Sequence, residues 1–571
     1  MTSQNTAVNN SHKALLPTVP ARIPTAAMVR PIPAAGPPDG AAGKEADLDE
    51  ILDEMGWGRF QCLHCALMAY VWFVGALQTL FMVFAKPGLR AELHIESSHT
   101  SALNSLFFVG MLVGAPVWGA ASDRLGRRRA FNIVMVLYVA CSFAEVVAPS
   151  YAAFAAARLV LGFLQAGQGL ISFVLCVELF SASRSATVGF VVAVAFSAGI
   201  VTLSLVAAAT DAASHWRLYA AVLFALELPV LLFLGWLVES PRWLLSRRGA
   251  EAAARVLRRV AAANRQQERP LRPPQAGGGG AGGEGEGLAA LLRGPKVRQR
   301  LLLMVVQWCV VSFVYYGLSF NVGNLSESVH LNNALSGLVE VPGYGGSTLL
   351  ADRYGRRPLL AGCLLGAGVA CLVAALPLPT AAITFAAMMG KLAASGAFNV
   401  AYFYGAELFP TSVRTAAIGA CSLAARVGGI VAPQALLLVP VAGTAAVMAI
   451  FGAASLASGL VALSLPETLH RPLPDTVADI DPPGDAPPGS RRWSGCCPTR
   501  HAQLLDRRAV ASASSGVEVG VGGRAEGCGA HEGGAPQPPL DPGLEAEEDA
   551  MGVPTVYGVP IEVVGCGATR V

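Results

Sequence analysis

A short charged motif occurs twice in this chain, with acidic and basic residues at the same spacing. It reads Asp-Arg-x-Gly-Arg-Arg, and the copies start 229 residues apart (352 minus 123). A glycine permits a tight turn between two helices, and the carboxylate and guanidinium groups around it can form ion pairs that break and re-form. This chemistry suits a switchable contact. The motif residues are Asp123, Arg124, Gly126, Arg127 and Arg128, and Asp352, Arg353, Gly355, Arg356 and Arg357.

Two further segments repeat at nearly the same separation. Glu178 lies in VELFSASRSATVGF and Glu407 in AELFPTSVRTAAIG, again 229 residues apart, and the glutamates of VESPRW and LPETLH are 228 apart. Three coincident separations indicate a duplicated unit. We expect the motif to bridge to Glu178 or Arg184 in one half, and to Glu407 or Arg414 in the other. Such ion pairs would close the cytosolic side and break when it opens.

The composition indicates the surroundings in which these motifs act. Hydrophobic residues make up 53% of the chain and charged residues only 14%, far from an ordinary soluble domain. Apolar residues form twelve blocks of roughly 20 residues, the length with which a helix crosses about 30 Å of hydrocarbon. The predicted spans are 63–85, 101–121, 129–148, 152–176, 187–209, 216–238, 301–322, 331–351, 357–376, 381–404, 414–438 and 442–465.

The repeated motifs fall after the second and the eighth span, at equivalent points of two six-helix halves. Parallel six-helix repeats are the architecture of major facilitator transporters, which bind substrate near the midplane between the halves. The sequence therefore predicts an all-α membrane protein of twelve transmembrane helices in two repeats. No metal-spaced His/Cys cluster, P-loop or nucleophile elbow is found, so we predict no cofactor, no metal and no enzymatic activity.

The distribution of basic residues predicts the orientation. The loops on one side hold 22 Lys and Arg, whereas those on the other hold only Lys86, Arg90 and Arg217. By the positive-inside rule both termini are cytosolic. The net charge of +3 is then a consequence of topology and does not indicate a nucleic-acid partner. No cysteine lies in a predicted external loop, so no disulfide framework is expected.

We predict five parts in the chain, two of which have features of their own. Residues 239–300 form a cytosolic loop with a basic amphipathic helix, expected on the inner leaflet of the bilayer, and a Gly-rich linker. The carboxyl terminus, Thr569-Arg570-Val571, matches the pattern that PDZ domains bind by strand addition. The parts are an N-terminal tail 1–62, a six-helix half 63–238, the loop 239–300, a second half 301–465 and a mostly disordered tail 466–571.

Across about residues 48–480 the sequence resembles the organic cation, carnitine and organic anion transporters of the major facilitator superfamily. The segments that carry this resemblance include SLFFVGMLVGAPVWGAASDRLGRRR, VESPRWLLSRRG, VEVPGY, MGKLAASGAFNVAYFYGAELFPTSVR and CSLAARVGGIVAPQ. The resemblance implies a plasma-membrane location. The chain departs from the family between the first two spans, where about 15 residues, 86–100, replace a long external loop.

The resemblance also implies a substrate class. Anion and carnitine members carry Arg at the position of Arg426, where cation members carry Asp. Anion members tend to place Lys at the position of Tyr344, whereas this sequence, with Glu340 and Tyr344 around the Pro, is similar to the carnitine members. Gln165 and Tyr402 match polar positions of the carnitine members.

These residues have a physical interpretation of their own. The Arg426 guanidinium can hold a carboxylate through two hydrogen bonds, Glu340 supplies a negative field, and aromatic rings such as Tyr316 and Tyr402 can face a quaternary ammonium. Such a site suits a zwitterion. Alternatively, Arg426 and Glu340 neutralise each other or Lys391, because an unpaired charge at mid-membrane is costly.

We therefore expect a carrier of a small, carnitine-like zwitterion. An organic anion exchanger, an organic cation transporter and a transport-inactive receptor or scaffold are the alternatives. A buried carboxylate such as Glu340 can exchange H⁺ or help to hold Na⁺, and the sequence does not decide between these ions, uniport and exchange.

Overall fold

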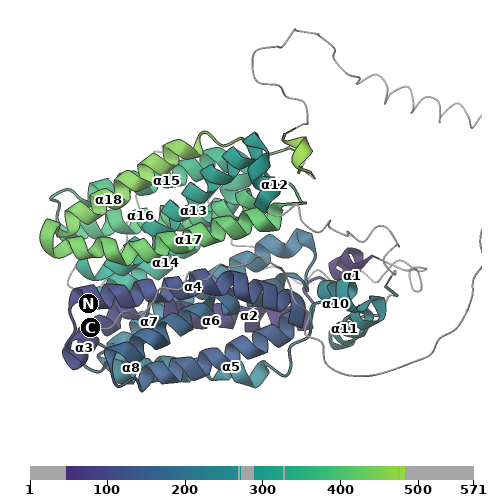
Figure 1. Ribbon diagram of the computed structural model, residues 1–571, viewed down its shortest axis with the longest axis horizontal. Helices are drawn as coiled ribbons and strands as arrows, with labels where there is room; N and C mark the ends of the chain where they lie inside the picture. Colours follow the sequence, from purple (N-terminus) through teal and green to yellow (C-terminus); the bar gives the residue numbers. More distant parts are fainter. Residues whose placement is uncertain are drawn as a thin grey trace, which may run out of the picture. The chain divides into compact units, whose positions relative to one another are not determined.

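The computed structural model describes an all-helical bundle. The described residues are 47–267, 270–271, 288–325, 328–471, 473–474 and 476–481. The Gly-rich linker, most of the N-terminal tail and the carboxyl-terminal Thr569-Arg570-Val571 lie outside them. The prediction of an all-α membrane fold is confirmed, with the helices grouped in two bundles that lie side by side (Figure 1).

The first bundle holds the N-terminal half. Its helices are largely apolar, and they bury side chains in a shared core that includes Phe107, Phe131 and Tyr138. The helices are α2 (Arg59–Thr79), α3 (Met82–Leu93), α4 (Ser97–Leu125), α5 (Arg127–Val146), α6 (Tyr151–Val177), α7 (Ser185–Thr210), α8 (Trp216–Glu227) and α9 (Pro229–Phe233).

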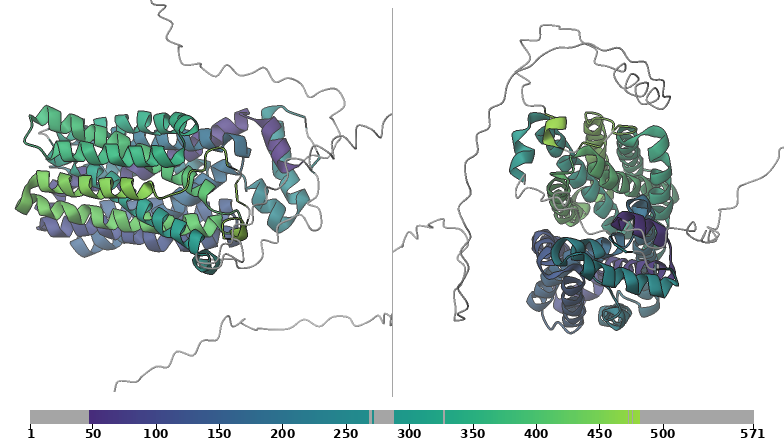
Figure 2. Two further views of the ribbon diagram at one scale, coloured as in Figure 1. Left: turned by 90° about the horizontal axis from the view of Figure 1, so that it is seen from above. Right: turned by 90° about the vertical axis from the view of Figure 1, so that its right-hand side faces the viewer.

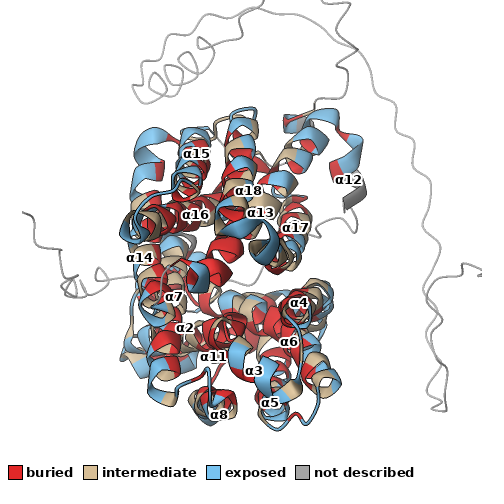
Figure 3. Ribbon diagram, turned by 90° about the vertical axis from the view of Figure 1, so that its left-hand side faces the viewer, coloured by how far each residue is buried: buried red, intermediate tan, exposed pale blue. Residues whose placement is uncertain are grey.

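The second bundle repeats this plan in the C-terminal half. Its helices are α13 (Pro295–Asn321), α14 (Val329–Tyr354), α15 (Arg356–Ala374), α16 (Thr380–Leu408), α17 (Arg414–Ala435) and α18 (Val439–Ala462). Figure 3 shows buried residues gathered on the inward faces of both bundles and exposed residues on the outer faces. The exposed large hydrophobics on those outer faces suit a lipid surrounding.

Ten described segments are long and apolar enough to cross a membrane. One of them, Arg414–Ala462, contains both α17 and α18 and so provides two crossings. The helix α14 is absent from the ten although it is 26 residues long, because it carries polar residues such as Asn332, Asn333 and Glu340. With these two corrections the helix count agrees with the predicted twelve.

The two halves meet along two pairs of helices. Helix α7 packs on α14, and α4 packs on α17 (Figure 3). The end-on view of Figure 2 also shows the two bundles side by side. Below, the side of the bundle that carries both Asp-Arg motifs is called the motif side, and the opposite side the far side. Helices α14 and α17, which carry Glu340 and Arg426, line the interface with the N-terminal half.

Short helices cover the motif side of the N-terminal half. They are α1 (Leu48–Met55), α10 (Pro241–Arg248) and α11 (Ala250–Asn264). The predicted amphipathic helix is α11. Its apolar face packs on the protein, so the prediction that this face lies on the bilayer is wrong. Ala253, Leu257 and Val260 are buried against the protein, and Asn264 accepts a hydrogen bond from the backbone N–H of Phe60 in α2.

The far side also differs from expectation. The segment 86–100, predicted as a loop, is largely helical, because α3 continues to Leu93 and α4 starts at Ser97. The left-handed backbone of His94 ends α3, and only three residues separate the two helices.

Candidate functional site

Both motif copies place glycine where a helix ends and the next begins. Gly126 lies between α4 and α5 with φ 95°, and Gly355 lies between α14 and α15 with φ 94°. A Cβ atom at these positions would lie 2.5 Å from Glu239 and 2.6 Å from Glu467, respectively. Only glycine permits both the positive φ and the close carboxylate.

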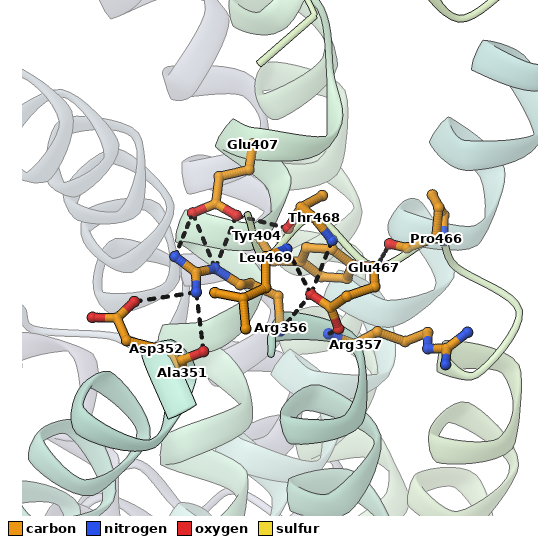
Figure 4. Close-up of polar contacts among 10 residues, drawn as sticks. All are labelled: Ala351, Asp352, Arg356, Arg357, Tyr404, Glu407, Pro466, Glu467, Thr468 and Leu469. Carbon is orange, nitrogen blue, oxygen red and sulfur yellow. Dashed lines mark hydrogen bonds and ion pairs between the residues drawn. The ribbon is translucent and has the colours of Figure 1, made fainter. Parts of the chain in front are cut away.

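The C-terminal copy forms a dense ion-pair cluster (Figure 4). The Arg356 guanidinium donates to both carboxylate oxygens of Glu407, with N–O distances of 2.9–3.1 Å, and its Nη1 lies 3.1 Å from Asp352. The Thr468 hydroxyl donates to Glu407 as well, at 2.7 Å. The cluster thus joins the ends of α14, α15 and α16 to the segment after α18.

Glu467 caps the first turn of α15 from the same segment. Its carboxylate accepts hydrogen bonds from the backbone N–H groups of Arg356, Arg357, Thr468 and Leu469 at 2.9–3.1 Å. Burial acts to raise the pKa of Glu467, but these four N–H groups outweigh it and hold the pKa below its ordinary value. The site is therefore built for the ionised carboxylate.

The N-terminal copy repeats this arrangement more loosely. Arg127 lies 2.6 Å from Asp123 but 3.6 Å from Glu178, and Glu239 accepts from the backbone N–H of Arg128 at 3.0 Å. The indole N–H of Trp243 in α10 donates to the carbonyl oxygen of Asp123. In both halves, the described ion pairs of the motif stay within the half that contains it.

The other predicted motif-side residues have separate environments. Arg184 binds Asp53 of α1, Arg414 donates to the carbonyl oxygen of Phe409, and Arg353 stacks on the ring of Tyr354. Arg124 is exposed. Sequence reasoning missed Asp53, because nothing in its spacing indicates the contact with Arg184.

At the middle of the bundle, Glu340 of α14 forms a buried ion pair with Lys391 of α16. The Lys391 Nζ lies 2.9 Å from Glu340 Oε1, and both side chains are 2% exposed or less. The Glu340 carboxylate also accepts from the Tyr315 hydroxyl at 2.7 Å and from Ser197, across the interface, at 3.1 Å. Tyr344 makes a longer contact with it at 3.5 Å.

Lys391 is held on its other side as well. It donates to the backbone carbonyl of Tyr315 and to the hydroxyl of Ser319, and its Nζ lies 3.2 Å from the centroid of the Tyr315 ring. Of the two alternatives for Glu340, the geometry is that of mutual neutralisation with Lys391. Ser197, Tyr315 and Ser319 complete this network, and only their positions in the fold reveal it.

Arg426 of α17 differs from this pair. Its Nε atom is buried and has no hydrogen-bond partner, and no ion pair joins Arg426 to another described residue. The guanidinium lies close enough to the Tyr316 and Tyr402 hydroxyls for its charge to act on both. Gly429, one turn on, faces Phe108 of α4, so Arg426 points toward the interface between the halves.

Tyr316 and Tyr402 each belong to a group of packed aromatic rings. Tyr402 contacts Trp308 and Phe398 with ring centroids 4.4 and 5.7 Å apart, and Tyr316 contacts Phe108 at 4.6 Å. Gln165 of α6 lies against Gly75 of α2, and no described contact joins it to Arg426. The candidate site therefore centres on Arg426, Tyr316 and Tyr402, beside the Glu340–Lys391 pair.

The halves are tied together on the far side. Asn333 of α14 donates to Ser204 and to the carbonyl of Ile200 in α7, and Gln434 of α17 donates to Ser105 in α4. The Ser197–Glu340 hydrogen bond also joins the two halves, at mid-bundle. These hydrogen bonds between described residues of the two halves thus lie at mid-bundle and on the far side. The described residues contain no group of three His, Cys, Asp or Glu side chains that could hold a metal ion.

Two six-helix bundles with matching motifs and a charged site between them define a membrane transporter of the major facilitator fold. Among solved structures, the chain is similar to the inward-open xylose transporter XylE from E. coli, with a TM-score of 0.58 and 16% identity, covering 72% of this chain and 97% of that one. At this identity the similarity supports the fold alone.

Sequence comparisons identify the family. Residues 64–477 match the model of the sugar (and other) transporter family, to which the chain belongs. It is 35% identical to a solute carrier family 22 member 15-like protein of Xenopus laevis (68% of this chain, 80% of that one). It is 31% identical to organic cation/carnitine transporter 4 of Arabidopsis thaliana (76% and 92%). The protein is thus a multi-pass membrane transporter and not an enzyme.

Proposed function

We propose that this transporter moves a small organic ion that carries a carboxylate, of the carnitine-like zwitterion type, by alternating access. The observation that supports this most is Arg426, a described cation beside the interface that has no anionic partner among the described residues. A guanidinium in a site of low dielectric binds a carboxylate far more strongly than it would in water. The rings of Tyr316 and Tyr402 can face the ammonium group of such a substrate.

The pairing of Glu340 with Lys391 favours a second candidate, an organic anion. Because the pair is neutral overall and its polar atoms bind Tyr315 and Ser197, Glu340 contributes less negative field than an unpaired carboxylate would. In this case the positive charge of Arg426 alone selects the substrate, and an ammonium group adds no affinity.

We further propose that the motif side is cytosolic and that the protein acts in the plasma membrane. The excess of Lys and Arg on that side supports the orientation. The far-side hydrogen bonds and the separate motif-side clusters then correspond to an inward-facing state. In the opposite state, the tie between Asn333 and Ser204 breaks. The ion pairs of Arg127 and Arg356 are intact in this structure, so we depart from the expectation that they break when the cytosolic side opens: each motif cluster keeps its own half together in both states.

Uptake of radiolabelled substrates into proteoliposomes tests this function. Carnitine, an organic cation and an organic anion are compared in the wild type, Arg426→Ala and Glu340→Gln. Carnitine uptake that needs Arg426 supports the proposal. Anion uptake that needs Arg426 but tolerates Glu340→Gln moves the protein to the second candidate. No uptake of any class by the wild type supports a receptor or scaffold role instead.

A further inference from the structure

A second buried charged cluster lies within the N-terminal half, apart from the Arg426 site. It joins four helices, because Gln78 comes from α2, Glu145 from α5, Arg158 from α6 and Glu227 from α8. Each of these side chains is buried, with 2% exposure or less. Neither the motif-side clusters nor the proposed substrate site uses any of them.

The contacts within this cluster leave one carboxylate oxygen without a partner. Arg158 Nη1 lies 3.4 Å from Glu145 Oε1 and donates to Gln78 Oε1 at 3.3 Å. The Gln78 amide donates to Ser142 and to Glu227 Oε1, at 3.0 and 2.9 Å. Glu227 Oε2 is buried and has no hydrogen-bond partner among the described residues.

The cluster holds two carboxyl groups but one guanidinium. Arg217, the next cation along α8, binds Glu92 and the carbonyls of Val146 and Ala148 instead. If both carboxyls were ionised, the cluster would keep an uncompensated negative charge among fully buried side chains, which is strongly unfavourable. The other titratable groups that face it are uncharged when protonated: Tyr70 on α2, Tyr138 and Cys141 on α5, and Tyr219 on α8.

The packing favours a proton over a metal ion as the balancing charge. The Arg158 guanidinium lies against the rings of Phe107 and Phe81, with distances of 4.4 and 5.7 Å to their centroids, and these rings offer no oxygen ligand to a metal ion. A hard metal cation needs a cage of several oxygen ligands, whereas a proton needs one carboxylate oxygen. The Tyr138 hydroxyl, also without a described hydrogen-bond partner, interacts electrostatically with both carboxyl groups.

We propose that Glu145 and Glu227 form a proton-binding site in which Glu227 carries the proton in this conformation. Binding adds one proton to the Glu227 carboxylate and makes a neutral acid, and release restores the carboxylate. A chain of contacts connects this site to the interface between the halves. Arg158 lies on Phe107, Phe107 contacts Phe108 at 5.8 Å, and Phe108 contacts Tyr316. The cluster is therefore connected by packed rings to the aromatic residues of the interface.

Infrared difference spectroscopy tests this site without any substrate. The full-length protein in lipid nanodiscs is compared at neutral pH with the Glu227→Gln, Glu145→Gln and Glu96→Gln variants. We expect the carbonyl stretch of a protonated, buried carboxyl group in the wild type and its loss in Glu227→Gln. Glu96 is an exposed control, so the Glu96→Gln variant should retain the band.

Two results would overturn the inference. One is a wild-type spectrum without this band, and the other is a band that survives Glu227→Gln. Loss of the band in Glu145→Gln alone would equally overturn the assignment of the proton to Glu227. Since the spectra need no transported molecule, failure here is distinguishable from failure of the proposed transport function.

Discussion

At the scale of single residues, the membrane interior of this protein contains, among the described residues, both paired and unpaired charged side chains. Glu340 and Lys391 neutralise each other, whereas Arg426 has no described anionic partner. Removing one member of a buried pair is far more costly than removing both, because the remaining charge is left desolvated. We therefore predict different effects for substitutions of the paired residues and of Arg426.

Single substitutions of the buried pair should destabilise the protein strongly. We expect Glu340→Gln or Lys391→Met to cost about 3–5 kcal/mol in the free energy of unfolding, and the double variant to recover a large part of it. Unfolding in detergent, measured for all four members of the cycle, checks this. Losses that simply add in the double variant would contradict the pairing.

Substitution of the motif glycine should also destabilise the fold. Gly355→Ala puts a Cβ at positive φ and 2.6 Å from Glu467, so we expect a loss of at least about 1–2 kcal/mol. Gly362→Ala in α15 is the matched control, because nothing lies within 4 Å of its Cβ. Thermal unfolding of the two variants should differ in this order, and equal melting temperatures would argue against the strained turn.

The Glu467 carboxylate, which caps the first turn of α15, leads us to predict a loss of stability at acid pH. The folded-state pKa of Glu467 lies below its unfolded value, about 4.3. Its contribution is therefore present above that pH and is lost as the pH falls through the folded-state pKa. Glu467→Gln should flatten this part of the pH dependence of the melting temperature. If the melting temperature of the variant still falls by the same amount at acid pH, other groups cause this decrease.

At the scale of elements, α1 is fixed to the motif side by a few polar contacts. Asp53 accepts hydrogen bonds from Ser181, Ser183 and Arg184, and these lower its pKa. We expect Asp53→Asn to speed amide hydrogen exchange over Leu48–Met55. Asp211→Asn, the same change on an exposed far-side residue, should leave that exchange unchanged. Equal exchange in the wild type and Asp53→Asn would contradict the proposed anchoring.

The sequence predicts most long helices well and the short ones poorly. Spans of about 20 apolar residues and duplicated motifs specify twelve crossings and their grouping, because few other structures satisfy the bilayer. The amphipathic pattern of α11 says that one face is covered but does not say whether lipid or protein covers it. Likewise, both Glu340 and Lys391 were candidates for pairing, but only the packing of α14 on α16 joins them.

At the scale of the whole molecule, transport requires the far-side contacts between the halves to separate. A disulfide between Ser204→Cys and Asn333→Cys should hold them together, because these two residues are in direct contact, with the Asn333 amide donating to the Ser204 hydroxyl at 2.8 Å. Oxidation should then stop uptake, and a reductant should restore it. Each single-cysteine variant, treated with the same oxidant, controls for the native thiols. Full uptake by the cross-linked protein would contradict this mode of movement.

The central claim is that Arg426 selects substrates by their carboxylate. The most direct test compares uptake of carnitine with that of choline, which has the ammonium but lacks the carboxylate, in wild-type and Arg426→Gln proteoliposomes. We predict a strong wild-type preference for carnitine that disappears in the variant through loss of carnitine uptake. A variant that still prefers carnitine would contradict the account.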